Sequence, residues 1–245
     1  MWTTLRGYYL SPVLILSLDT TTRAGSCALF AGGRLLREQA SDPAVSPAAR
    51  LPGDLMALLA AQDAALDDID AFAVGTGPGS FTGLRVGIAT MQGLAVAMKK
   101  PLVGVSAFDA LASVAVAPGE PDTARPTTAR IATWIDAWRG EVFAALYEGG
   151  REVEAPSVEP PARLLARYVG AGTLFTGDGA ARHRTEIVQA LDDEAHFTDP
   201  VMPLLAGMMA SLAADVLAQG HRPLPHAIRP LYVRRSDAEL ARDRS

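Results

Sequence analysis

The sequence predicts an α/β fold of two lobes, each opening with antiparallel strands followed by β/α units. Two observations carry this prediction. Apolar runs bounded by turn signals follow in the order βββαβαβα up to residue 117, and a hairpin pattern at residues 129–147 then begins the plan again. A Pro/Gly/Ala-rich break at residues 118–128 is the predicted linker. The second lobe is predicted to be reduced.

The predicted first lobe spans residues 13–117. Its first strand, at residues 13–18, is almost entirely apolar, which is typical of a strand covered on both faces, and it ends at a polar turn that begins with Asp19. The later elements are strands at 26–30 and 34–39, helix 54–62, strand 71–74, helix 82–98, strand 102–105 and helix 106–116.

The predicted second lobe spans residues 129–235. It opens with a hairpin whose strands are joined by the turn at residues 136–140. The hairpin strands are residues 129–135 and 141–147. The remaining predicted elements are strands at 174–175 and 231–233 and helices at 161–168, 180–191 and 204–218. We expect residues 1–12 to form a flexible extension and residues 236–245 a tail.

The composition is that of a globular protein of 245 residues, with 49% hydrophobic and 20% charged residues. A net charge of −5 argues against a strongly basic face for nucleic acid. The single cysteine, Cys27, excludes an internal disulfide, and its apolar neighbours predict an inert buried thiol. No apolar run reaches the ~20 residues of a membrane span. We therefore expect a cytoplasmic protein without a membrane partner.

The most informative stretch is the run GTGPGSFTGLRVGIAT at residues 75–90. It follows a short strand and passes directly into a helical pattern, an arrangement in which backbone N–H groups face an anion or another chain. No lysine follows the glycines, so the run is not a Walker loop. Ser80 stands where the dinucleotide fingerprint requires glycine. The run thus has the outline of a phosphate loop without its reactive residues.

Six segments together resemble the TsaB (YeaZ) family from residue 13 almost to the C-terminus. They are ILSLDTTT (15–22), GTGPGSFTGLRVGIA (75–89), PLVGVSAFDAL (101–111), IDAWRGEVFAALY (135–147), LFTGDGA (174–180) and RPLYVRR (229–235). The resemblance implies an actin-like ATPase fold of the ribonuclease H-like class that has lost catalysis. It also explains why a protease label, inherited from the glycoprotease name of the superfamily, would be misleading.

The resemblance further implies a non-catalytic scaffold that pairs with TsaD, the subunit that performs N6-threonylcarbamoylation of the adenosine beside the anticodon. The tRNAs concerned read codons that start with A. TsaE joins the pair, tRNA is contacted through the complex, and the isolated chain is expected to form a homodimer. Family members often carry a His-Ser-Glu pattern ahead of the first helix. Here residues 47–50 read Pro-Ala-Ala-Arg, a change that a scaffold tolerates.

The helix predicted at 82–98 is rich in glycine, although each glycine inside a helix costs ~1 kcal/mol relative to alanine. Small residues four apart let a second helix approach closely. We therefore interpret this helix as a seam toward TsaD or a second copy; burial of the same face against the chain's own sheet is the alternative. The predicted interface residues are Gly83, Leu84, Arg85, Gly87, Ile88, Met91 and Leu94.

Hydrolytic and metal-dependent chemistry finds little support in the sequence. Ser80 is a candidate nucleophile for a peptidase, but all four histidines lie beyond residue 180, and we interpret Ser80 or Thr82 as the helix N-cap. No metal site is expected, because the prolines between His221 and His226 prevent their alignment on a helix.

An ATP-dependent phosphotransferase or ATPase of the actin-like superfamily is the alternative function. Asp19 and Asp136 would then hold Mg²⁺ near the phosphates. Threonines follow Asp19 where a glycine is expected to admit phosphate, so we predict at most a remnant of a nucleotide loop and no cofactor. The residues of this predicted remnant are Asp19, Thr20, Gly77, Gly79 and Ser80.

Two tryptophans, Trp134 and Trp138, flank Asp136 in the second-lobe hairpin. They offer a stacking platform for a nucleic-acid base. Packing of the hairpin onto the sheet is the interpretation that we prefer. The basic segment 229–235 is followed by acidic residues, and we interpret it as a solvated tail.

Overall fold

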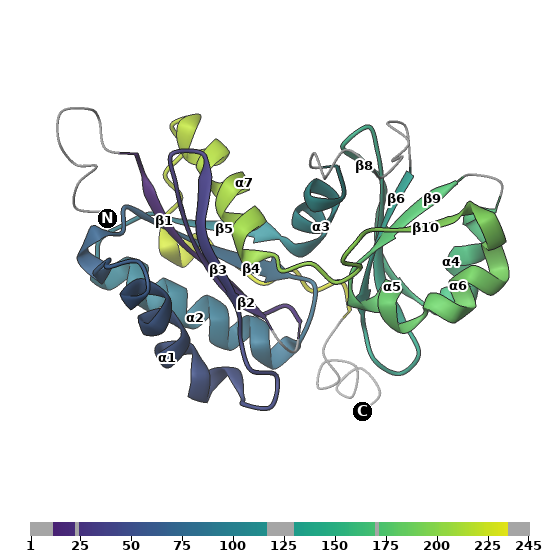
Figure 1. The fold of residues 1–245 in the computed structure, drawn as a ribbon, viewed down its shortest axis with the longest axis horizontal. Helices are drawn as coiled ribbons and strands as arrows, with labels where there is room; N and C mark the ends of the chain where they lie inside the picture. Colours follow the sequence, from purple (N-terminus) through teal and green to yellow (C-terminus); the bar gives the residue numbers. More distant parts are fainter. Residues whose placement is uncertain (1–11, 23–24, 117–129, 170–171, 235–245) are drawn as a thin grey trace, which may run out of the picture. The chain divides into compact units, whose positions relative to one another are not determined.

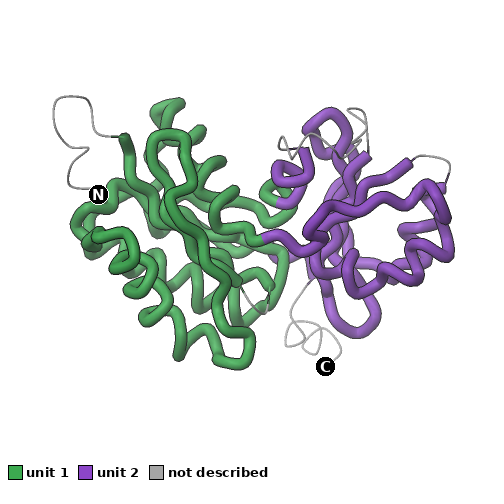
Figure 2. Tube along the Cα trace, viewed as in Figure 1, with its two compact units in different colours: residues 1–110, 204–230 green, residues 111–203, 231–245 purple. Residues whose placement is uncertain are grey.

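The computed structural model describes residues 12–22, 25–116, 130–169 and 172–234, which form two compact units (Figures 1 and 2). Unit 1 comprises residues 1–110 and 204–230, and unit 2 comprises residues 111–203 and 231–245. Each unit is built around a sheet of five strands. The predicted extension at 1–12 (Pro12 apart), the linker at 118–128 and the tail at 236–245 lie outside the described residues.

The sheet of unit 1 has the strand order β3-β2-β1-β4-β5. Its central strand, β1, pairs antiparallel with β2 and parallel with β4. Every residue of β1 is buried, as the continuous apolar run predicts. The strands are β1 (Leu14–Asp19), β2 (Ser26–Ala31), β3 (Arg34–Ala40), β4 (Ala71–Gly77) and β5 (Leu102–Ser106).

Helices cover both faces of this sheet (Figure 1). The helices α1 (Pro47–Ala60) and α2 (Phe81–Ala97) lie side by side on one face, while α7 (Ala206–Ala218) packs on β1, β2 and β4 from the other. Leu14, Leu16 and Phe72 lie in the core beneath α1 and α2. The helix α1 begins seven residues before the predicted start at 54, because Pro47 opens it at a first-turn position and Pro52 is accommodated within it.

The sheet of unit 2 repeats the same plan in the order β10-β9-β6-β7-β8. Its central strand, β6, pairs antiparallel with β7 and parallel with β9. The last two strands have only four and three residues, the reduction that the sequence predicts. The strands are β6 (Arg130–Asp136), β7 (Val142–Glu148), β8 (Arg151–Glu159), β9 (Thr173–Thr176) and β10 (Ala195–Phe197). The helices are α4 (Pro161–Tyr168), α5 (Asp178–Arg182) and α6 (Arg184–Leu191).

The division of the chain differs from the predicted lobes at 13–117 and 129–235. The helix α7 belongs to unit 1, and α3 (Ala107–Val116) passes into unit 2 at Leu111. The chain therefore crosses between the units more than once, which a single break at 118–128 does not indicate. The strands β8 and β10 were not predicted, and the strand predicted at 231–233 does not form.

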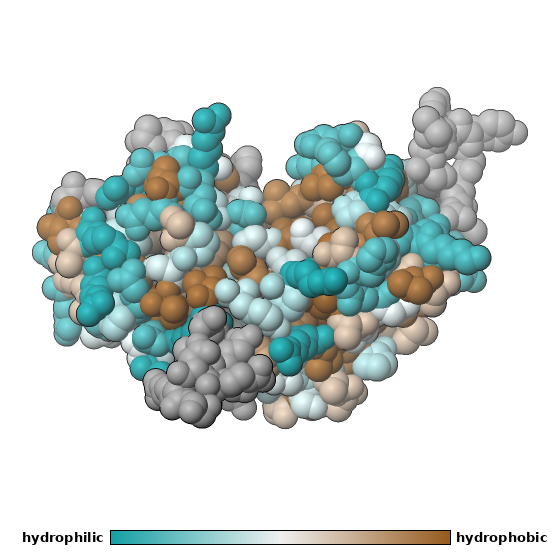
Figure 3. All heavy atoms as spheres, turned by 180° about the vertical axis from the view of Figure 1, so that it is seen from behind, coloured by the Kyte–Doolittle hydropathy of each residue, from teal (hydrophilic) through white to brown (hydrophobic). Residues whose placement is uncertain are grey.

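The surface is of mixed character. On the face shown in Figure 3, apolar residues lie in small groups among hydrophilic ones. None of the helices in the described ranges has both the length and the apolar character needed to cross a membrane.

The glycines of α2 face inward, toward the turn that follows β1. A Cβ atom on Gly83 would lie 2.5 Å from the Thr20 carbonyl oxygen, and one on Gly87 would lie 2.2 Å from Thr20 Oγ1. Leu84, Ile88 and Met91 are buried in the same unit. The prediction that these five residues contact another chain is therefore wrong: the close neighbour is the chain's own β1 turn. Of the predicted seam, only Arg85 and Leu94 retain exposed surface.

We expect Gly87→Ala to lower the free energy of unfolding by about 2 kcal/mol or more, because the added methyl overlaps the buried Thr20 side chain. The matched control is Gly93→Ala in the same helix, where a Cβ meets nothing within 4 Å. That change should raise stability by up to ~1 kcal/mol through helix propensity. Urea unfolding of both variants measures the two effects. Equal effects at the two positions would contradict the inward packing of Gly87.

Candidate functional site

The glycine loop between β4 and α2 is occupied by atoms of the β1 turn. The Ser80 N–H donates to the Thr21 carbonyl oxygen at 2.8 Å, and Ser80 Oγ accepts from the Gly83 N–H at 3.2 Å, which confirms Ser80 as the N-cap of α2. Gly79 has φ +155°, and a Cβ there would lie 2.2 Å from the Thr21 carbonyl oxygen. The β1 turn thus occupies the place at the helix N-terminus where an anion would bind.

Asp19 is the buried acid of this region, with 2% of its surface exposed. Its Oδ1 accepts from the Thr21 N–H at 2.8 Å. Burial raises the pKa of Asp19 from 3.8 to about 6; the Thr21 N–H opposes this rise and the nearby charge of Glu38 adds to it. The structure brings Asp19, Thr20, Gly79 and Ser80 together at the β1 turn, where protein atoms fill the space. Gly77 lies at the end of β4, opposite Ser106 of β5.

Glu38 is a second acid, which the sequence prediction missed. Its Oε1 accepts from the Gly207 N–H at 2.8 Å and from Ser26 Oγ at 3.3 Å, and Ser26 Oγ accepts from the Ala206 N–H at 3.1 Å. Burial raises the pKa of Glu38, while the hydrogen bond from Gly207 lowers it. The one available signal was Leu205: a helix whose N-cap lacks a polar side chain needs an acceptor from elsewhere.

Asp136, the proposed second Mg²⁺ ligand, is held by its own unit. Its Oδ1 accepts from the Trp138 N–H at 3.0 Å, and its Oδ2 lies 3.1 Å from Arg182 Nη1. A cation at this carboxylate would have to displace Arg182. Among the described residues, no three His, Cys, Asp or Glu side chains gather as a metal site.

The two hairpin tryptophans differ in environment. Trp134 is buried and packs edge-on against Phe175, with ring centroids 5.3 Å apart, and beside Tyr168, so the packing interpretation is confirmed for it. Trp138 is 47% exposed, so about half of it stays in water and the packing interpretation is not confirmed for it. Cys27 is a free, buried thiol, and burial raises its pKa to about 12, in agreement with the prediction of an inert residue.

The outward surfaces of α1 and α2 form a face of unusual chemistry, which we call the α1/α2 face. None of the exposed residues of α1 is charged, and Arg85 is the one charged residue among those of α2. The Arg85 guanidinium lies over the Phe81 ring, 3.8 Å from its centroid. The α1/α2 face consists of Ala48, Ala49, Pro52, Gly53, Met56, Ala57 and Ala60 from α1 and Phe81, Thr82, Arg85, Ala89, Gly93, Val96 and Ala97 from α2.

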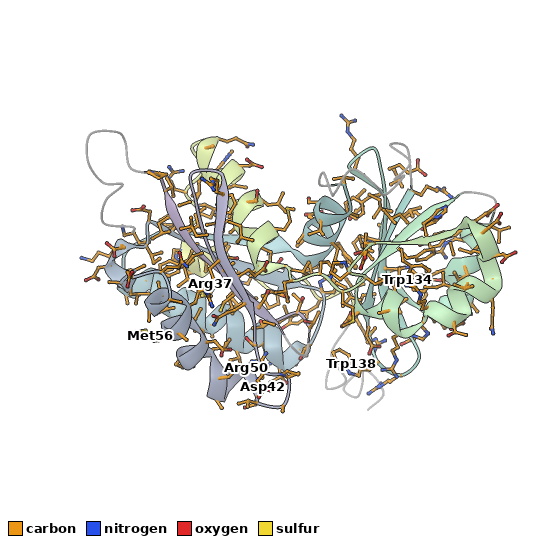
Figure 4. All side chains as sticks on the ribbon, viewed as in Figure 1. Arg37, Asp42, Arg50, Met56, Trp134 and Trp138 are labelled. Carbon is orange, nitrogen blue, oxygen red and sulfur yellow. The ribbon has the colours of Figure 1, made fainter. Side chains whose placement is uncertain are left out.

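A face of this kind is typical of surfaces that contact other proteins. Helices that border water normally carry charged residues on the exposed side. Here Met56 is 61% exposed and Val96 is 62% exposed, and small residues between them allow close approach. Figure 4 shows Met56 on the side of α1 that points away from the sheet. The α1/α2 face replaces the inward-facing predicted set as the candidate interface.

We expect Asp19→Asn to stabilise the protein at pH 7.5. The pKa of Asp19 is raised in the fold, so its contribution is fully present below pH 3.8 and is lost as the pH rises through about 6. The ionised carboxylate then costs about 3 kcal/mol, most of which the neutral amide avoids. The gain, measured by urea unfolding, should vanish toward pH 4. A variant less stable than the parent at pH 7.5 would contradict this account.

Comparisons with known proteins agree on one family. The sequence profile described as TsaD, tRNA N6-adenosine threonylcarbamoyltransferase, matches residues 48–241. The tRNA threonylcarbamoyladenosine biosynthesis protein TsaB of Escherichia coli is 34% identical over 171 residues, covering 65% of this chain and 71% of that protein. An uncharacterized protein of Mycobacterium leprae is 30% identical over 230 residues, and these span 92% of this chain but only 56% of that longer relative.

Solved structures give the same result. YeaZ from Pseudomonas aeruginosa has a TM-score of 0.69 at 31% identity and covers 90% of this chain and 99% of its own. Component A of (R)-2-hydroxyglutaryl-CoA dehydratase from Acidaminococcus fermentans has a TM-score of 0.52 at 9% identity, with coverage of 84% and 99%, a likeness of fold alone. The predicted actin-like fold is confirmed by the duplicated sheets and these neighbours. The chain belongs to the TsaB (YeaZ) family.

Proposed function

We propose that this chain is a non-catalytic subunit in the N6-threonylcarbamoylation of tRNA, which pairs with TsaD through the α1/α2 face. The names of its relatives support the pathway: the Escherichia coli relative is a tRNA threonylcarbamoyladenosine biosynthesis protein. In this proposal TsaD performs the transfer beside the anticodon of tRNAs that read codons starting with A. TsaE joins the pair, and the isolated chain forms a homodimer through the same face.

The observation that carries the pairing is the absence of charge among the exposed residues of α1. Interface cores are depleted of charged residues and contain anchors such as Met and Phe. Met56 and Phe81 are exposed anchors of this type, and Arg85, stacked on Phe81, is placed to pair with a carboxylate of the partner. The match to the TsaD profile over residues 48–241 further supports pairing, because two chains of one fold can pack with similar helices face to face.

The non-catalytic role is supported by how the candidate site residues are used. Ser80 caps α2, Asp19 holds the β1 turn and Asp136 is bonded to Trp138 and Arg182. Each of these side chains has a structural partner within its own unit. No contact of the described residues favours the ATP-dependent phosphotransferase.

The buried side chain of Arg50 holds the start of α1, one of the two helices that form the α1/α2 face. The Arg50 guanidinium donates to the backbone carbonyls of Asp42 and Val45 and pairs with Asp54 at 3.8 Å, so it fixes the segment that leads into α1 (Figure 4). Arg50 lies in the stretch that replaces the family's His-Ser-Glu pattern. The replacement therefore keeps an ordered start of α1 rather than a catalytic group.

We expect Met56→Glu and Ala89→Glu each to weaken the complex with TsaD of the same cell on the order of tenfold or more, because a charge would be buried in an apolar contact. Both positions are exposed, so the chain should fold normally. The matched control is Val188→Glu on α6, which is 42% exposed in unit 2. Size-exclusion chromatography and calorimetry measure the pairing.

Full pairing by both α1/α2 variants would remove this face from the proposal. Loss of pairing by the Val188→Glu control as well would show a general effect of added charge. The same variants in a tRNA modification assay test whether pairing is needed for the reaction.

We expect calorimetry of the isolated chain with Mg-ATP to give no saturable heat at micromolar concentrations. The Thr21 carbonyl already accepts from the Ser80 N–H, and Arg182 occupies one oxygen of Asp136. Tight binding that Asp19→Ala abolishes would instead support the phosphotransferase.

A further inference from the structure

The turn between β6 and β7 presents an exposed aromatic side chain. Trp138 is 47% exposed at this turn, whereas Trp134, four residues earlier, is buried among Tyr168 and Phe175 (Figure 4). The part of a large apolar ring that stays in water gains nothing for the fold. The two tryptophans of the hairpin therefore have different tasks, and only Trp134 serves the core.

The backbone at Trp138 is in the left-handed region. Its φ is 55°, the φ of Arg139 is 57° and that of Gly140 is 76°. This conformation is higher in free energy for bulky L residues than for glycine. Such residues persist where the surrounding structure imposes the conformation, most often at functional sites. A glycine or asparagine at position 138 would form the same turn at lower cost. The choice of tryptophan therefore points to use of its ring.

Contacts on either side hold the turn in this shape. Asp136 Oδ1 accepts from the Trp138 N–H at 3.0 Å, and the Glu141 N–H donates to the Trp138 carbonyl at 3.0 Å. Arg234 donates to the Ala137 carbonyl at 3.1 Å and pairs with Glu141. The ring is thus presented from a fixed backbone, which lowers the entropy lost when a ligand stacks on it.

Several charged side chains belong to this turn and to the segments bonded to it. Arg139 is exposed, and the Arg182 side chain is 57% exposed, while the side chain of its partner Asp136 is only 15% exposed. Arg234 lies over the Phe143 ring, 5.7 Å from its centroid, and its side chain is 22% exposed, less than the 33% of its partner Glu141. Asp178 is half-buried beneath the turn and accepts from the Asp136 N–H. At this turn Arg139 and Arg182 are thus exposed cations, whereas the carboxylates of Asp136 and Asp178 are partly buried.

We propose that Trp138 stacks on an unpaired base of the anticodon loop of the tRNA substrate, with Arg182 and Arg139 on the flanking phosphates. This rests on the proposed function, which supplies the RNA. Unpaired loop bases stack on aromatic rings, and guanidinium groups contact the backbone. The surroundings favour RNA over a protein partner: the α1/α2 face is apolar with one charge, whereas here a single ring is bordered by exposed arginines.

The test is tryptophan fluorescence of the complex with TsaD, titrated with a synthetic anticodon stem-loop RNA. The Trp138→Phe complex, subtracted from the parent, isolates the emission of Trp138. We expect saturable quenching in the parent, and an RNA affinity that is lower on the order of tenfold in Trp138→Ala and only slightly lower in Trp138→Phe. Arg182→Gln should weaken binding and reduce the salt dependence by about one phosphate contact.

Pairing with TsaD is measured on the same samples by size-exclusion chromatography, so the two proposals fail separately. A complex that forms but binds RNA equally well with Trp138→Ala overturns the stacking proposal alone. If no complex forms, the proposed function fails, and the titration is read on the isolated chain. Quenching of Trp138 by TsaD without RNA would assign the ring to a protein contact and overturn the proposal.

Trp138→Gly provides a second readout. If the ring serves a ligand and not the fold, removing it at φ 55° should raise the thermal midpoint while abolishing the RNA response. A lower midpoint would show that Trp138 stabilises the hairpin and would also overturn the proposal.

Discussion

The contact between the β1 turn and the inner side of α2 is the constraint on which the rest of unit 1 depends. Thr20 fills the space that Gly83 and Gly87 leave open, at distances that admit no side chain on either glycine. Asp19 fixes the Thr21 N–H and so aims the Thr21 carbonyl at Ser80. This fit sets how closely α2 lies on the sheet, and it buries Leu84, Ile88 and Met91 below the helix.

The same contact separates two roles that α2 would otherwise share. On its inner side, backbone and threonine atoms occupy the helix N-terminus, so the loop with the outline of a phosphate site is filled by protein. On its outer side, Ala89, Gly93 and Val96 remain exposed next to the uncharged surface of α1. A helix whose N-terminus is closed and whose outer surface is apolar is suited to hold a partner rather than a nucleotide.

Much of the fold was predictable because strands and turns have local signals. The all-buried β1 and the hairpin of unit 2 each follow from apolar runs and turn residues, whereas the strand order of unit 2 did not. The placement of α7 on unit 1 was not predictable, because it depends on contacts between segments about 170 residues apart, such as Gly207 with Glu38. The strand β8 was missed because its alternating charged and small residues, with Pro156, read as a loop.

The site was predicted in part. Glycines inside α2 correctly indicated a close neighbour, and Ser80 was correctly assigned as its cap. Helical spacing cannot distinguish a neighbour within the chain from one in a second chain, because both demand the same missing side chains. The exposed set became visible only when the structure showed which side of α2 faces the β1 turn. Met56 and the uncharged surface of α1 had no motif to signal them.

Two features of the molecule cost stability, and they differ in what offsets the cost. Ionised Asp19 is unfavourable in its buried position, but its carboxylate orients the β1 turn, so a structural contact made in every folded molecule offsets part of the penalty. The left-handed backbone at Trp138 is held by hydrogen bonds to Asp136 and Glu141, but nearly half of the tryptophan surface stays exposed and adds nothing to the stability of the fold. A strained residue with an exposed side chain persists where a ligand binds that side chain. By this reasoning Asp19 belongs to the architecture of the fold, and Trp138 belongs to recognition.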